Sequence, residues 1–178
     1  LVDLNVPFDC DMAVVTDSRL PGIMVDGQVT LAGPFSFSEV PGFPEHVQGG
    51  TFSVLSVSGK KVIHVHGTVL MNEGRSNEEI GYTVRTLQKL RVKTIIFINE
   101  VGSFSSEFTP DSLVLIRDHF NLSGRNPLFG HNKREFGIRF IDMGNLYTAS
   151  LRQLIRRCAD QMDLRMPEVN AAFVVGPV

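Results

Sequence analysis

The chain has 178 residues, of which 43% are hydrophobic and 20% charged, and its formal net charge is -2. This composition is ordinary for a folded chain that buries a sizeable core, and the length fits a single domain over residues 1–178. The near-neutral charge excludes the basic field that nucleic acid or an anionic membrane requires, and the apolar stretches are too short to cross a bilayer. We therefore expect neither nucleic-acid binding nor membrane insertion.

The amino end and the cysteines indicate a compartment. Residues 1–6 carry Asp3 and lack the basic start of a secretory signal, so we expect a cytoplasmic protein. The only two cysteines, Cys10 and Cys158, allow one long-range disulfide, but we expect reduced thiols in a cytosolic chain.

The first part of the chain has the pattern of β-strands. Residues 11–16 form a short apolar run that ends in a polar turn, which predicts a buried strand. Residues 21–44 are rich in glycine and proline and lack helical periodicity. Residues 51–57 and 61–66 alternate around Ser58-Gly59, which predicts two strands joined by a tight hairpin.

Helices and further strands are predicted beyond this hairpin. Ser76 and Glu79 form a capping-box pattern. The apolar residues behind it recur at helical spacing and predict one buried face, made by Ile80, Val84, Leu87 and Leu90. Residues 145–162 are the strongest helix pattern, with one apolar side made by Leu151, Leu154, Ile155, Cys158 and Met162. Strands are predicted at 94–99, 113–117 and 171–175.

The alternation of strands and helices predicts an α/β fold around a largely buried sheet. Because the predicted hairpin pairs antiparallel strands, we expect this sheet to be mixed. The pattern contains no linker or repeat that would divide the chain.

Individual polar groups suggest chemistry only weakly. His64 and His66 are two apart on a predicted strand and face the same way, but no third ligand has convincing spacing, so we expect no metal site. For Arg117-Asp118-His119 we expect a strand-end ion pair. Ser18 follows the first strand, yet its surroundings match neither a P-loop nor a nucleophile elbow, and taken alone it predicts a turn.

Longer segments are more specific. They are Phe37-Ser38-Glu39-Val40-Pro41-Gly42-Phe43-Pro44, Met71-Asn72-Glu73-Gly74, Leu115-Ile116-Arg117-Asp118-His119-Phe120-Asn121-Leu122, Ser123-Gly124-Arg125-Asn126-Pro127-Leu128 and Glu135-Phe136-Gly137-Ile138-Arg139-Phe140. These segments occur in the same order, and with nearly the same spacing, as in the trimeric purine nucleoside phosphorylases. The chain resembles that family from residue 11 onward. The resemblance implies a mixed, twisted sheet flanked by helices and a threefold assembly. It also implies attack of phosphate on a purine nucleoside, with no cofactor and with phosphate as co-substrate only if the chain is active.

The expected phosphate site departs from the family pattern. Ser18 matches the family's phosphate-binding serine, but Asp17, Arg19 and Pro21 stand where glycines belong. Asp17 would repel an anion, and we expect Arg19 to face solvent.

Other positions of the family's site are also substituted. The phosphate-binding arginine and histidine are replaced by Thr68 and Leu70, and a further histidine by Gln48. A small residue after the retained Asn99 is replaced by Glu100.

The sugar and base positions are partly kept. The ribose-side tyrosine is Asn72, whereas Glu73 and Phe136 match the family. The sequence ends before the family's purine-binding residues, so the resemblance implies a member with a shortened carboxyl end.

Three hypotheses follow from this pattern. The leading one is a phosphorylase-like chain with catalysis lost or weak, which serves a structural or binding role in a homo-oligomer or a larger complex. The alternative is an active phosphorylase completed by a missing carboxyl-terminal segment or a second chain. A third is a binding domain that senses a purine nucleoside or a cation.

Overall fold

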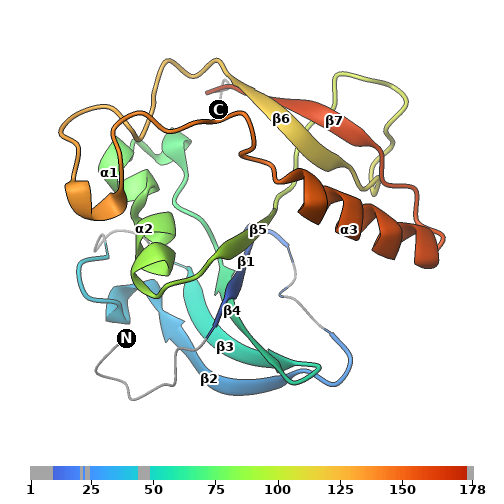
Figure 1. The fold of residues 1–178 in the computed structure, drawn as a ribbon, viewed down its shortest axis with the longest axis horizontal. Coiled ribbons are helices and arrows are strands. Elements are labelled where there is room, and N and C mark those ends of the chain that lie inside the picture. Colours follow the sequence, from blue (N-terminus) through green and yellow to red (C-terminus); the bar gives the residue numbers. More distant parts are fainter. Residues whose placement is uncertain (1–9, 21, 23–24, 44–48, 176–178) are drawn as a thin grey trace. The chain divides into compact units, whose positions relative to one another are not determined.

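The computed structural model describes residues 10–20, 22, 25–43 and 49–175 (Figure 1). The chain divides into two compact units, Leu1–Val101 and Gly102–Val178, and each is described by itself. The predictions that concern residues outside the described ranges, among them Pro21 and Gln48, are therefore not addressed by the structure.

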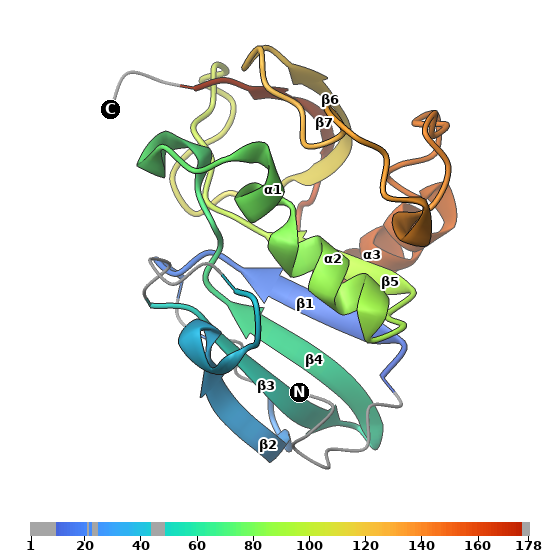
Figure 2. The same ribbon diagram turned by 90° about the vertical axis from the view of Figure 1, so that its left-hand side faces the viewer.

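The first unit is built on a five-stranded mixed sheet with the order β2-β3-β4-β1-β5 (Figures 1 and 2). Strand β1 (Met12–Thr16) lies between β4 (Lys60–His66) and β5 (Thr94–Ile98) and runs parallel to both. Strand β3 (Thr51–Val57) pairs antiparallel with β4 and with β2 (Val29–Ser36). The predicted α/β fold with a mixed, twisted sheet is thus confirmed.

The hairpin between β3 and β4 forms where the sequence predicts it. Ser58 and Gly59 both have positive φ, at 48° and 74°, which is the backbone of a type I′ turn and matches the twist of paired strands. Strand β2 was not predicted, because Pro34 interrupts it and cannot donate a backbone hydrogen bond. The pairing of β2 with β3 shifts register on both sides of Ala32.

The predicted capping box starts the helical segment of this unit. The Ser76 hydroxyl accepts from the Glu79 amide at 3.2 Å, and the Glu79 carboxylate accepts from the Ser76 amide at 2.7 Å. Helix α1 (Asn77–Ile80) continues into α2 (Tyr82–Lys89), which lies along the sheet in Figure 2. Leu87 is fully buried, as predicted, but Val84 is 44% exposed, so the prediction that it joins the buried face is wrong.

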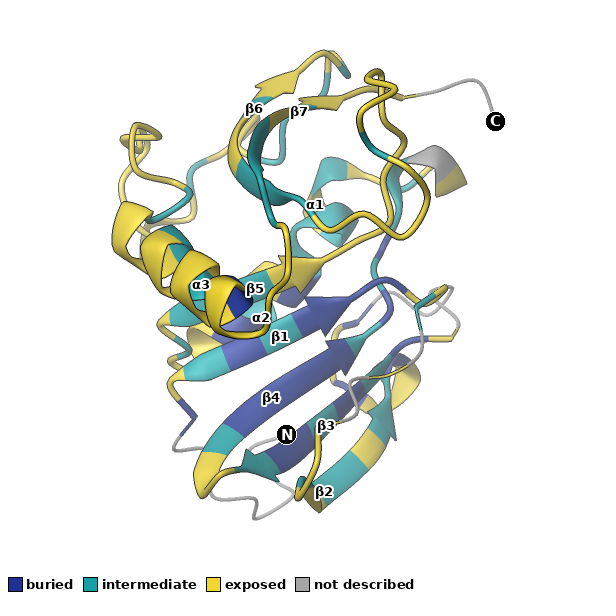
Figure 3. Cartoon of the chain, turned by 90° about the vertical axis from the view of Figure 1, so that its right-hand side faces the viewer, coloured by how far each residue is buried: buried dark blue, intermediate teal, exposed yellow. Residues whose placement is uncertain are grey.

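The core of the first unit lies between this helix and the sheet. Figure 3 shows the buried residues concentrated on β1, β3 and β4, the central strands. At one end of the core the rings of Phe37, Phe43 and Phe52 pack in tilted and edge-to-face arrangements at centroid distances of 4.3 to 5.9 Å. Gly50 is required here, because a Cβ at this position would lie 2.0 Å from the ring of Phe37.

The second unit pairs β6 (Leu115–Asn121) in parallel with β7 (Glu168–Phe173). Between them lie a 3-10 turn, η4 (Arg134–Phe136), and α3 (Ala149–Gln161), the helix predicted for 145–162. Arg152 of α3 forms an ion pair with Glu168 of β7.

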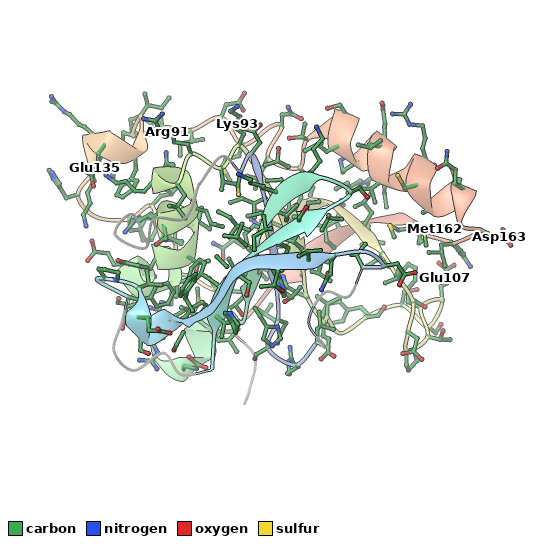
Figure 4. All side chains as sticks on the ribbon, turned by 90° about the horizontal axis from the view of Figure 1, so that it is seen from below. Arg91, Lys93, Glu107, Glu135, Met162 and Asp163 are labelled. Atoms are coloured by element: carbon green, nitrogen blue, oxygen red, sulfur yellow. The ribbon has the colours of Figure 1, made fainter. Side chains whose placement is uncertain are left out.

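The apolar side predicted for this helix is largely exposed. Leu151, Leu154 and Met162 are 37%, 49% and 69% exposed, and Met162 and Asp163 project from its end in Figure 4. Cys158 on this helix is exposed, and Cys10 in the first unit is buried. Among the described residues, no helix combines the length and the apolar character that a membrane crossing needs.

Candidate functional site

The carboxyl ends of three parallel strands meet at one edge of the first unit's sheet. Thr16, the last residue of β1, is in register with His66 of β4 and with Ile98 of β5. The segments that follow these strands therefore leave the sheet together. In open α/β sheets, ligands bind outside the carboxyl ends, where connections from one strand diverge to both sides. Strand β1 occupies such a position between β4 and β5.

The turn after β1 carries a buried carboxylate held by an arginine. The side chain of Asp17 is only 6% exposed, and Arg19 donates to it through Nε (3.2 Å to Oδ1) and Nη2 (2.8 Å to Oδ2). The backbone amide of Arg19 adds a third bond to Oδ1 at 3.0 Å. Arg19 is the main cause that lowers the pKa of the Asp17 carboxyl, which burial would otherwise raise. Asp17 is therefore a carboxylate over the whole physiological pH range.

A second carboxylate approaches the same guanidinium from the segment after β5. Glu100 Oε2 lies 3.6 Å from Arg19 Nε. The Asp17 amide also donates to the carbonyl of Ile98 at 3.1 Å, which ties the turn after β1 to the end of β5. Arg19 thus faces two carboxylates, and the three side chains together carry one net negative charge. The expectation that Arg19 faces solvent is correct for the 62% of its side chain that is exposed, but its charged end is engaged by Asp17.

Two histidines share one threonine hydroxyl beside this cluster. Thr16 Oγ1 lies 3.1 Å from His64 Nε2 and 3.2 Å from His66 Nδ1. Burial lowers the pKa of His64, and the neighbouring His66 lowers it further. The pair predicted to face one way does so, with ring centroids 6.0 Å apart. Within the described residues, no group of three or more histidine, cysteine, aspartate or glutamate side chains is arranged to hold a metal ion.

The sequence-predicted phosphate positions lie around this edge. Ser18 is exposed on the turn after β1, and Thr68 and Leu70 are half-buried in the segment after β4. Asn99 and Glu100 are exposed immediately after β5. Gln48, the remaining substituted position, lies outside the described residues.

The close approach of two backbones fixes the start of the segment after β4. Gly67 has φ +98° and donates to the Thr16 carbonyl at 2.8 Å. A Cβ on Gly67 would lie 2.9 Å from the Cα of Gly50, so a glycine is required for the segment to turn here.

The remaining predicted residues have other surroundings. Asn72 and Glu73 belong to the 3-10 turn η3 (Met71–Glu73), and exposed Glu73 pairs with Arg75 at 3.5 Å. The side chain of Asn72 is outside what the structure describes. Phe136 ends η4 in the second unit and is half-buried.

The Arg117-Asp118-His119 segment lies on β6 and forms different contacts from the ion pair that we expected. Arg117 Nε donates to Asn170 Oδ1 at 2.9 Å, and the Asp118 carboxylate accepts from the His119 amide at 2.8 Å. His119 Nδ1 lies 3.2 Å from the Tyr147 hydroxyl. Register brings Arg117 and Asn170 together on paired strands 53 positions apart, which the sequence pattern does not reveal.

Sequence reasoning missed Thr16 and the engagement of Arg19. Thr16 reads as the last residue of an apolar strand, and its role depends on the β1–β4 register, which pairs residues about 50 positions apart. The position of Arg19, two residues after Asp17, could have predicted this ion pair, because a side chain at this spacing can fold back across a turn.

Comparison with known proteins agrees with this architecture. Residues 25–178 match the sequence model of the family described as the phosphorylase superfamily. A purine nucleoside phosphorylase 1 from Bacillus subtilis (strain 168) is 31% identical over 176 residues, which cover 97% of this chain and 64% of that protein.

Solved structures give the same result. Schistosoma purine nucleoside phosphorylase has been solved in complex with hypoxanthine and with guanosine, and both structures superpose with a TM-score of 0.85 at 25% and 26% identity. Each covers 99% of this chain, which spans 64% and 63% of those chains. The motifs, the mixed sheet and these similarities lead to one conclusion: the chain belongs to the phosphorylase superfamily, as a member of the nucleoside phosphorylase family.

Proposed function

We propose that this chain is a purine nucleoside phosphorylase-like protein in which phosphate binding, and with it phosphorolysis, is weak or lost. The observation that carries this proposal is the engagement of Arg19 by Asp17 and its proximity to Glu100. Arg19 is the only cationic residue in the three segments 17–20, 67–70 and 99–102 that follow β1, β4 and β5. An incoming phosphate dianion would have to compete with a buried carboxylate for this one guanidinium.

The expected loss of phosphate binding can be estimated from the charged groups that are absent or added at the site. A hydrogen bond to a charged group contributes about 1.5–3 kcal/mol, and each ~1.4 kcal/mol corresponds to tenfold in rate or binding. Thr68 and Leu70 offer no charge where the resemblance expects an arginine and a histidine, and Asp17 and Glu100 add repulsion. If these terms add, the loss is on the order of 10⁴-fold.

The direct test is an assay of phosphorolysis with the purified chain, with guanosine and inosine as substrates and phosphate in excess. Guanosine is the first choice because a related structure holds it. We expect base release far below the rates of about 1–10³ per second that are typical of enzymes. Turnover within that range would overturn the proposal.

The role that we propose in place of catalysis is structural or binding, within a homo-oligomer or a larger complex. The support is a set of exposed large apolar side chains in the second unit, which includes Phe129, Ile138, Phe140 and Met143. We infer that these side chains contribute to a surface for protein contact. Native mass measurement tests the homo-oligomer, for which the resemblance implies a trimer. A monomeric mass would leave only a larger complex, and the expected cytoplasmic location can be checked by microscopy of a tagged chain.

The alternative is an active phosphorylase completed by a further segment or a second chain. It is favoured by the exposure of Ser18 and of the Arg19 side chain, since an exposed arginine can turn from Asp17 to a bound phosphate. This alternative predicts ordinary turnover by the product of the full-length transcript, read beyond Val178. An inactive full-length product would contradict it.

A further inference from the structure

A cavity lies in the second unit, where β6 and β7 begin. These parallel strands start together, since Leu115 is in register with Glu168 and its amide donates to the carbonyl of Pro167 at 2.9 Å. The segments that precede the two strands therefore lie side by side. Between them they line an open cavity of about 210 Å³, with residues from 107–113 on one wall and from 164–167 on the other.

Local hydrogen bonds build both walls of this cavity. In the wall before β6, the Ser112 amide donates to the Thr109 carbonyl at 3.0 Å, and the two hydroxyl oxygens lie 3.3 Å apart. In the wall before β7, the Leu164 amide donates to the Ala159 carbonyl at 2.9 Å and closes the end of α3. Because these bonds need no ligand, the cavity is formed before anything binds, as is usual for small-molecule sites.

The cavity has an apolar surface that one small ligand can cover. Phe108 is half-buried, and Leu113 and Leu164 are 51% and 39% exposed. A ligand with a hydrocarbon chain would remove part of this surface from water, which favours binding. The cavity volume lies below the range of about 300–1,000 Å³ that is typical of sites for drug-sized ligands, so it fits a single amino acid better than a nucleoside.

Three charged side chains of the cavity have no ion-pair partner within the part of the chain that the structure describes. Glu107, which is labelled in Figure 4, and Asp111 lie on the wall before β6, and Arg165 lies on the facing wall. Glu168, three positions after Arg165, pairs with Arg152 of α3 instead. All three charges of the cavity are therefore available to a ligand.

We propose that this cavity binds a free basic α-amino acid, for which L-lysine is the probe. Two carboxylates and one guanidinium give the cavity one net negative charge. Lysine carries the complementary set of one carboxylate and two ammonium groups, with one net positive charge. Its carboxylate pairs with Arg165, whose planar fork matches a carboxylate. Its ammonium groups pair with Glu107 and Asp111, and its methylene chain lies against Phe108.

This inference goes beyond the proposed function and does not rest on it. The residues that line the cavity all belong to the second unit, whereas the expected phosphate positions follow β1, β4 and β5 of the first unit. Lysine binding is therefore measured without reference to phosphorolysis.

An NMR titration of the isotope-labelled chain with L-lysine at neutral pH tests the proposal. We expect saturable shifts of the amide signals in residues 107–113 and 164–166. Three analogues each lack one charge: cadaverine lacks the carboxylate, L-norleucine lacks the side-chain ammonium, and Nα-acetyl-L-lysine lacks the α-ammonium. Each should bind about fivefold more weakly than lysine, which is the upper effect of one solvent-exposed charge pair.

Variants assign the charges of the ligand to residues. Arg165→Gln should weaken lysine binding about fivefold without weakening cadaverine, which has no carboxylate. Asp111→Asn should also weaken lysine binding about fivefold, and asparagine suits this position because the φ of Asp111 is 73°. As matched controls, Arg157→Gln and Asp26→Asn change exposed charges that do not line the cavity and should leave lysine binding unchanged.

Absence of lysine binding, or shifts confined to other segments, would overturn the inference. Cadaverine that binds as tightly as lysine would do the same, as would Arg165→Gln with unchanged lysine affinity. Equally tight binding of Nα-acetyl-L-lysine would contradict a free amino acid as the ligand. If a variant fails to fold, the shift map and the analogue series still decide, because both use the unmodified chain. Ordinary phosphorolysis rates would overturn the proposed function and leave these binding results standing.

Discussion

Arg19 reaches back two residues and binds both carboxylate oxygens of Asp17, at 3.2 Å and 2.8 Å. The anionic partner of Arg19 is thus a side chain of the same turn. A planar guanidinium fork fits a carboxylate as well as it fits a phosphate, so under the proposed function Asp17 competes with an oxyanion for Arg19. The pair explains how the turn after β1 can keep its place in the sheet with a carboxylate buried in it.

Removal of the carboxylate should free the arginine for an external anion. We expect Asp17→Asn to bind sulfate at pH 8 about tenfold tighter than the unmodified chain does, because a repulsive charge is lost and Arg19 loses its partner. Calorimetry measures this, and Asp11→Asn is a matched control, because Asp11 pairs with Lys93 at 2.7 Å on the opposite end of β1. Unchanged or weaker sulfate binding in Asp17→Asn would contradict the prediction.

The same substitution should lower stability in a pH-dependent way. Because the pKa of Asp17 is lowered in the folded chain, its stabilising effect is complete above the ordinary aspartate value of about 4 and is lost as pH falls through the folded value. We expect Asp17→Asn to reduce the free energy of unfolding by about 1 kcal/mol at pH 7, a modest loss because solvent screens the exposed arginine. Urea unfolding at several pH values tests this: the difference from the unmodified chain should shrink in acid.

His64 should make the fold less stable in mild acid. Burial lowers the pKa of His64, so the unfolded chain takes up a proton at this residue at a higher pH than the folded chain does. The free energy of unfolding should therefore fall below about pH 6.5 and level off once folded His64 is protonated. In His64→Gln this part of the dependence should disappear, and in His131→Gln it should remain. Urea unfolding between about pH 5 and 8 measures both, and equally steep curves for the two variants would be inconsistent with the assignment.

Gly67 should be far less replaceable than Gly74. Both have positive φ, at 98° and 76°, but only at Gly67 would a Cβ meet another backbone, 2.9 Å from the Cα of Gly50. We expect Gly67→Ala to cost about 3 kcal/mol of unfolding free energy and Gly74→Ala about 1 kcal/mol, the latter for backbone conformation alone. Chemical denaturation of the two variants decides the matter, and equal losses would show that the close approach is unimportant.

The two apolar residues of α2 should differ in the same way. Leu87 is fully buried and Val84 is 44% exposed. Leu87→Ala should cost about 2–5 kcal/mol, as is usual for a cavity in a core, whereas Val84→Ala should change stability by about 0.5 kcal/mol or less. Thermal unfolding compares them. A larger loss at Val84 would mean that this side chain is covered in solution by a contact outside the described residues.

Sequence patterns predicted the local structure better than the site. The hairpin at Ser58-Gly59 and the capping box at Ser76 were predictable because each depends on residues within a few positions of one another. Strand β2 was missed because Pro34 breaks the alternation, and the partial burial of α2 could not be resolved by periodicity, which does not say how wide the buried face is.

The site depends on relationships that no local pattern contains. The resemblance indicated which positions surround the expected phosphate, and the segments that carry Ser18, Thr68 and Glu100 do follow adjacent parallel strands. The rotation of Arg19 toward Asp17 and the meeting of His64 and His66 at Thr16 depend on side-chain geometry and on strand register. Both relationships belong to the tertiary structure and cannot be inferred from a local sequence pattern.

The hydroxyl of Thr16 has a single hydrogen to donate, yet it lies within bonding distance of two imidazole nitrogens. While both rings are neutral, Thr16 can donate to only one of them, and the other ring must then donate its own N–H to the hydroxyl oxygen. At most one of the two rings can accept from Thr16, so a tautomer change that makes one ring the acceptor requires the other ring to donate its N–H. A change of hydrogen-bonding partner at the exposed ring would be passed through one rotating O–H bond to a ring in the core.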